Sequence, residues 1–250
     1  EALDALPEPS PGDVFFDFEG DPLWRPHPGA PAGLEYLFGV EVLDTAGDDP
    51  GAYGPPDAAG ARYRAWWAHD RAGEKQALAD FLGWLAARRR AYPGLHVYHY
   101  AAYEVTALKR LTAAHGIGTE ELDDLLRSQV FVDLYATVRA AVRVSQPSYS
   151  IKKLEPLYMG DELRDADGVT AGGDSIIEYQ RYREAVAEGD ELTAEVADID
   201  ALAAAVRLAA VGQQCDSHVY PVLSAAASSS VMVTSLRPRR RMSSISSSLL

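Results

Sequence analysis

Two carboxylates two positions apart are the part of this sequence best suited to chemistry. Asp17 and Glu19 lie in the segment 14–22, which is otherwise mostly aromatic and aliphatic. Because side chains alternate along a strand, both carboxylates would project from one face while Phe16 and Phe18 fill the other. Burying two like charges together is costly unless a cation neutralises them. The spacing indicates a Mg²⁺ or Mn²⁺ site with oxygen ligands, and the alternative is a solvated face of an edge strand.

A third acid follows at the point where a predicted strand gives way to a predicted helix. Glu104 stands in the first turn of the helix expected over 103–115, from which it can reach the end of the first strand. A ligand from a second element is what a two-metal phosphoryl-transfer centre requires. The alternative is an acid that only stabilises the helix dipole. His99 and Tyr103 are placed either to orient a water molecule or to pack in the core.

The elements that must position these residues alternate between strands and helices. Strands are expected at 14–22, 34–43, 61–68 and 95–100, and 130–135 is expected to be a further strand or a strand entering a helix. Helices are expected at 74–90, 103–115, 120–128, 149–158 and 195–211. A hairpin followed by alternating elements predicts an α/β fold with a mixed sheet. Arg88, Arg89 and Arg90 end the first helix, where positive charge favours the helix dipole.

Composition limits the classes of function. The 250 residues carry a net charge of −14, which argues against a broad basic surface for duplex DNA. It does not exclude a nucleic-acid enzyme in which metal ions supply the positive charge. No apolar run is long enough to span a membrane, no secretion signal opens the chain, and the single Cys215 fits a reducing cytoplasm. Nucleophile elbows, zinc spacings and phosphate-binding glycine loops do not occur.

Four segments together carry a family resemblance, namely 14–22, 99–104, 131–135 and 149–154. In order and spacing they resemble the YprB-type domain of the RNase H-like, DEDD 3′–5′ exonucleases, which occurs in bacterial RecB-like nucleases. The resemblance covers about residues 12 to 188. It implies an RNase H-like mixed sheet flanked by helices.

The resemblance also implies roles for single residues. Asp17 and Glu19 match the first exonuclease motif and would bind both of two Mg²⁺ or Mn²⁺ ions. Glu104 matches the second motif, where related exonucleases usually carry Asp. Asp133 matches a supporting acid. By position, Lys152 and Lys153 would contact phosphate or form a solvated helix face.

The fourth acid of this family cannot be identified in the sequence. A Tyr-Asn-x-x-Asp motif is expected near residues 200–204, where this chain has Asp200 but no Tyr-Asn pair. Either the ligand was lost, or a frameshift altered the final helix. The frameshift is the favoured hypothesis, because the Ser- and Arg-rich tail beyond Asp216 contains no acid. The chain is divided into a linker (1–12), an exonuclease domain (13–212) and a low-complexity, disordered tail (213–250).

The predicted function is a two-metal 3′–5′ exonuclease that acts on single-stranded DNA or RNA ends. Other nuclease or helicase domains of a longer parent protein are the expected partners, with a role in DNA repair. The alternative is a catalytically weak or inactive nucleic-acid-binding scaffold with the same fold. A glycosidase ranks last, because Asp17 and Glu19 on one strand do not flank a sugar cleft.

Overall fold

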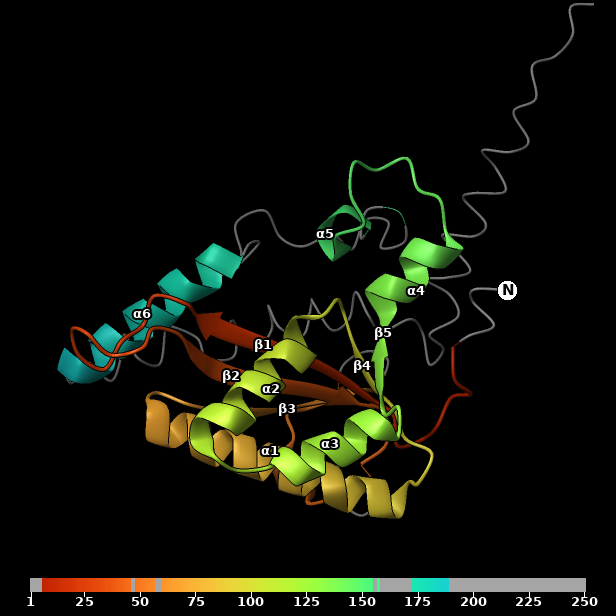
Figure 1. Ribbon diagram of the computed structural model, residues 1–250, viewed down its shortest axis with the longest axis horizontal. Helices are drawn as coiled ribbons and strands as arrows, with labels where there is room; N and C mark the ends of the chain where they lie inside the picture. Colours follow the sequence, from red (N-terminus) through yellow and green to blue (C-terminus); the bar gives the residue numbers. More distant parts are fainter. Residues whose placement is uncertain (1–5, 46–47, 57–59, 155–156, 158–171, 189–250) are drawn as a thin grey trace, which may run out of the picture.

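A five-stranded mixed sheet forms the centre of the computed structural model, which describes residues 6–45, 48–56, 60–154, 157 and 172–188 (Figure 1). The strands are β1 (Val14–Asp21), β2 (Leu34–Val42), β3 (Arg62–Trp67), β4 (Val97–His99) and β5 (Phe131–Asp133). The helices are α1 (Arg71–Ala91), α2 (Tyr103–His115), α3 (Thr119–Arg127), α4 (Leu134–Ala141), α5 (Ile151–Leu154) and α6 (Gly172–Glu188), with a 3₁₀ turn at Pro50–Ala52.

The order of strands across the sheet is β3-β2-β1-β4-β5. β1, β2 and β3 pair in antiparallel fashion, while β1, β4 and β5 run parallel. Phe15 pairs with Tyr98, and His99 pairs with Asp133. The carboxyl ends of the three parallel strands therefore meet at one edge of the sheet, where α/β folds usually place their ligands. The predicted mixed sheet flanked by helices is confirmed.

One face of the sheet is covered by α1, α2 and α3 and contains the largest apolar core. Phe16 and Phe18 project into it, as their alternation with the two carboxylates predicts. The Phe16 ring stacks on Phe81 of α1 with centroids 4.5 Å apart, and Leu108 of α2 packs into the same cluster. Burial of apolar side chains in such a core supplies most of the favourable free energy of folding. The sequence of β1 thus leaves its opposite face for the acids.

The opposite face is covered by α4 and α6, on the side where Figure 1 also shows α5. Phe15, Tyr98 and Leu134 of α4 form one apolar cluster there. Tyr36 of β2 stacks on Tyr179 of α6 with centroids 3.9 Å apart. No helix was predicted over 172–188, so α6 is an element that the sequence analysis missed.

Two predicted boundaries are instructive. The segment 130–135 divides into β5 and the start of α4, because the Asp133 side chain accepts a hydrogen bond from the Ala136 N–H and caps the helix. α2 ends as predicted at Gly116, whose φ of 65° lies in the left-handed region that glycine adopts readily. The predicted helix at 195–211 and the tail at 213–250 lie outside the described residues. No described helix is both long and apolar enough to cross a bilayer.

Candidate metal-binding site

Acidic side chains from two elements meet beside the carboxyl ends of β1 and β4. Asp17 and Glu19 come from β1, and Glu104 comes from the first turn of α2. Asp17 stands opposite Gly39 in the β1–β2 ladder, where no side chain competes for space on this face. The three acids that the sequence analysis selected from two separate segments therefore lie at one place.

The carboxyl groups of Asp17 and Glu104 are close enough to perturb each other. Burial raises the pKa of Asp17 well above its usual range, and the charges of Glu104 and Glu19 raise it further. A hydrogen bond between the Asp17 and Glu104 side chains acts in the same direction, while the Phe18 N–H, which donates to Asp17 Oδ1 at 2.8 Å, lowers the pKa. Without a cation, the site therefore favours a proton on Asp17.

Glu104 is nearly inaccessible to solvent, and its Oε2 atom accepts no hydrogen bond from any described residue. The His99 ring lies beside it, with Nδ1 3.3 Å from Oε2. A buried carboxylate oxygen without a partner costs about 1–3 kcal/mol or more. A hard divalent cation would remove that cost, since carboxylate oxygens are its preferred ligands.

A strained turn holds His99 and Glu104 in place. Ala101 has a φ of 76°, which is uncommon for a residue with a Cβ. Its N–H donates to Asp133 Oδ1 at 3.0 Å, and its carbonyl oxygen lies 2.6 Å from His99 Nδ1. Because a carbonyl oxygen only accepts, Nδ1 carries the imidazole proton. Backbone strain of this kind persists where the surroundings enforce it, often at functional sites.

Asp133 supports this turn from the neighbouring strand. Its Oδ1 accepts from Ala101 and from Ala136, and so joins the β4–α2 turn to the start of α4. Asp133→Ala is expected to lower the free energy of unfolding by about 2 kcal/mol, since it removes a helix cap and a turn contact. Asp133→Asn keeps an acceptor and should cost less than half as much. Urea unfolding measures both, and an alanine variant as stable as the wild type would refute this supporting role.

The raised pKa of Asp17 predicts how the stability of the metal-free protein depends on pH. The unfolded chain loses this proton near pH 4, whereas the folded chain keeps it to higher pH. The free energy of unfolding therefore falls as the pH rises from about 4 through the folded pKa of Asp17. Asp17→Asn removes the charge, so above that pKa it should stabilise the metal-free protein by about 0.5–2 kcal/mol.

Thermal melts in EDTA between pH 4 and pH 8 test this dependence. The melting temperature of Asp17→Asn relative to wild type should rise with pH. A difference that is constant across this range would show that Asp17 titrates normally in the folded protein.

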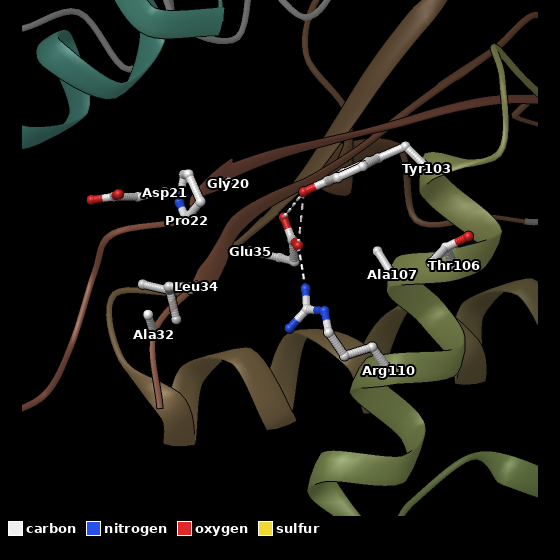
Figure 2. A pocket seen from close by; sticks show the side chains of 11 residues that line it. Gly20, Asp21, Pro22, Ala32, Leu34, Glu35, Tyr103, Thr106, Ala107 and Arg110 are labelled. Atoms are coloured by element: carbon white, nitrogen blue, oxygen red, sulfur yellow. Dashed lines mark hydrogen bonds and ion pairs between the residues drawn. The ribbon is translucent and has the colours of Figure 1, made fainter. Parts of the chain in front are cut away.

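Tyr103 lines a neighbouring pocket of about 270 Å³, where its side chain points toward Glu35 (Figure 2). Its hydroxyl donates to Glu35 of β2 at 2.9 Å, and Arg110 of α2 forms an ion pair with the same carboxylate. Burial raises the pKa of Glu35, while Tyr103 and Arg110 lower it. A Cβ at Gly20 would lie 2.2 Å from Glu35 Oε2, so a larger residue there would displace the Glu35 carboxylate. Two lining residues, Gly20 and Tyr103, directly adjoin site acids in the sequence.

Three predicted site residues remain, namely Lys152, Lys153 and Asp200. Lys152 and Lys153 are exposed on α5, and nothing in the structure assigns a ligand to them. Asp200 lies outside the described residues. Within the described ranges, no group of three His, Cys, Asp or Glu side chains forms a preformed metal cage.

The chemistry of the acids nevertheless fits a divalent cation. Mg²⁺ usually keeps several waters and is held by one or two carboxylates together with substrate phosphates, so it does not need an all-protein cage. Asp17 and Glu104 would provide those two carboxylates. The observation that favours a cation there is the buried Glu104 oxygen that accepts no hydrogen bond from a described residue.

Ser175 and Tyr36 were not selected from the sequence. Ser175 Oγ donates to Glu19 Oε2 at 2.7 Å, and the Tyr36 hydroxyl donates to Ser175 Oγ at 3.1 Å. The signal available for them was weak: Ser175, Tyr179 and Tyr182 have the spacing of one helix face, in a segment without a strong apolar period.

Comparison with known proteins gives one family. The model of the RNase H superfamily matches residues 14–194, which include every strand and helix described above. Neither the curated proteins nor the solved structures gave a match.

Proposed function

The chain belongs to the RNase H superfamily, and from this membership we propose that it is a metal-dependent nuclease of the YprB type. It shortens single-stranded DNA or RNA from the 3′ end. The observation that carries the proposal is the pair of neighbouring carboxylates at Asp17 and Glu104, with a buried Glu104 oxygen that accepts no hydrogen bond from any described residue. Membership of the RNase H superfamily and a cluster of carboxylates suited to a divalent cation together favour phosphodiester hydrolysis.

Each residue has a task in this proposal. Asp17, Glu19 and Glu104 bind Mg²⁺ or Mn²⁺, two ions in all, and the His99 ring lies beside Glu104 as a supporting residue. Divalent cations at such a site neutralise the phosphodiester charge and polarise the bond for attack by water. The pocket lined by Tyr103 and Arg110 adjoins the carboxylates and accepts the nucleotide next to the cleaved bond.

The surroundings of this domain are also proposed rather than observed. The domain extends over residues 13–212 of a longer cytoplasmic protein and works beside other nuclease or helicase domains. Asp200 is the candidate for the fourth acid. The net charge of −14 suits a substrate held through metal ions and few basic contacts, so the affinity for oligonucleotides should depend only weakly on salt.

End-labelled oligonucleotides test the activity and its direction. The full chain is incubated with 5′-labelled single-stranded DNA and RNA in Mg²⁺, in Mn²⁺ and in EDTA. The proposal predicts a ladder of progressively shorter 5′-labelled products in at least one metal and none in EDTA. A 3′-labelled strand should release labelled mononucleotide at once. If the protein binds the oligonucleotides but shortens them in neither metal, the proposal of a nuclease is wrong and a nucleic-acid-binding scaffold is favoured.

A further inference from the structure

A chain of hydroxyl groups leads from β2, by way of α6, to Glu19. The Tyr36 hydroxyl donates to Ser175 Oγ at 3.1 Å, and Ser175 Oγ donates to Glu19 Oε2 at 2.7 Å. Tyr36 and Ser175 are both buried, with at most 1% of their surface exposed. Two elements far apart in the sequence, β2 and α6, therefore meet at one carboxylate of the candidate metal-binding site.

The direction of these hydrogen bonds follows from proton counting. A hydroxyl group has a single proton to donate. The Glu19 carboxylate only accepts, so Ser175 donates its proton there and accepts from Tyr36. Burial raises the pKa of Tyr36, and the charge of Glu19 raises it further, so Tyr36 remains a donor at any physiological pH. Both hydrogen bonds in this series therefore have their protons directed toward Glu19.

α6 is anchored separately from this chain. The Tyr179 ring stacks on Tyr36, and the Tyr179 hydroxyl donates to the Ala68 carbonyl oxygen at 3.1 Å. His69 Nδ1 lies 2.9 Å from the same hydroxyl oxygen. These contacts fix the first turns of α6 against the sheet edge, so Ser175 has a defined position.

Glu19 needs such support because of its place on β1. The β1–β2 register shifts between Glu19 and Gly20, so the strand is irregular directly after this residue. Glu19 is also partly exposed and has a long side chain. Ordering a glutamate side chain costs up to about 1.5–2 kcal/mol of conformational entropy, and a fixed donor meets part of that cost before any ligand binds.

We propose that Ser175 is a positioning residue for Glu19, and that Tyr36 acts through Ser175. Together they hold the Glu19 carboxylate in the orientation in which it binds a divalent cation. This inference rests on the proposed function, since it assigns Glu19 as a metal ligand. Partners of this kind typically contribute 10–100-fold to metal affinity.

A pair of matched tyrosine variants separates this role from simple packing. Tyr36→Phe and Tyr179→Phe each remove one hydroxyl from the same stacked ring pair. Only Tyr36→Phe removes a hydrogen bond from the series Tyr36–Ser175–Glu19, whereas Tyr179→Phe removes a contact that anchors α6. Ser175→Ala breaks the chain directly, and Ser148→Ala, at an exposed serine, serves as the control. Isothermal titration of the full-length, EDTA-stripped protein with Mn²⁺ gives the dissociation constants, and thermal melts in EDTA report the fold.

Ser175→Ala should weaken Mn²⁺ binding about 10–100-fold, and Tyr36→Phe about 5-fold. Tyr179→Phe and Ser148→Ala should bind as the wild type does, and all four should melt as folded proteins. Wild-type affinity in both Ser175→Ala and Tyr36→Phe would overturn the inference. So would an equal loss in Tyr179→Phe, since docking of α6 alone would then explain the effect. A wild-type protein that binds no Mn²⁺ would refute the proposed function itself.

Discussion

Asp17→Asn is expected to lower metal-dependent hydrolysis by about 1,000-fold or more. The substitution keeps the shape of the side chain. It removes one of the negative charges with which Asp17, Glu19 and Glu104 would together bind a cation. Metal ions contribute several kcal/mol of transition-state stabilisation, and about 4 kcal/mol corresponds to this factor. Because the substitution also relieves repulsion in the metal-free protein, the variant should lose activity while its fold remains intact.

Initial rates of shortening of a labelled oligonucleotide in saturating Mn²⁺ measure this loss. Asp80→Asn is the matched control, since Asp80 is exposed on α1 and its side chain accepts a hydrogen bond from Gln76 of the same helix. It should retain wild-type rates. If Asp17→Asn hydrolyses as fast as this control, the reaction takes place somewhere other than at these carboxylates.

Arg88→Met is expected to destabilise the protein by about 3–5 kcal/mol, although the site lies elsewhere. The Arg88 side chain is buried, and its Nε donates to the Gly12 carbonyl oxygen at 2.9 Å. It also donates to the Asp44 carbonyl oxygen at 2.8 Å and pairs with Asp48 at 3.0 Å. Methionine fills similar space but removes all of these donors at once, and among the described residues Asp48 would keep only its hydrogen bond from the Tyr53 hydroxyl. Breaking a buried charged network in this way is costly.

Arg90→Met provides the control from the same helix end, because Arg90 is exposed. Its effect should stay within about 0.5 kcal/mol. The cost at Arg88 should appear in urea unfolding and as a fall in melting temperature of roughly 10 °C. Equal effects of the two substitutions would mean that the hydrogen bonds of Arg88 add no stability beyond the interaction of a positive charge with the helix dipole.

Arg88 also shows where sequence reasoning reaches its limit. The three arginines at the end of α1 predict a favourable interaction with the helix dipole, and their spacing alone does not distinguish the buried one. The partners of Arg88 come from the segments that enter β1 and follow β2, some 40 to 76 residues away in the sequence. Contacts at that separation depend on the tertiary fold, which local patterns do not encode.

The acids of the site were accessible to sequence reasoning for the opposite reason. Asp17 and Glu19 interrupt an apolar strand at a period of two, so their common face follows from strand geometry. Glu104 follows a strand and begins a helix, which places it near the end of a parallel strand. The mixed sheet also followed from the order of its elements.

Ser175 and Tyr36 could not be found in this way. Their hydroxyl groups matter only because α6 packs against β2, and the sequence of α6 lacks a regular apolar stripe. Neutral hydroxyl groups are common throughout a protein, whereas a pair of acids in an apolar strand is conspicuous. Asp200 and the predicted final helix lie outside the described residues, so the fourth acid stays a prediction.

The most direct test of the central claim is a crystal of the full chain soaked in Mn²⁺, with anomalous difference maps. We expect an anomalous peak between Asp17 and Glu104, with carboxylate oxygens about 2.0–2.2 Å away. Glu104 Oε2 should be a ligand or contact a water bound to the ion. If no peak forms at millimolar Mn²⁺ and the two side chains stay hydrogen-bonded to each other, these acids do not form a metal site.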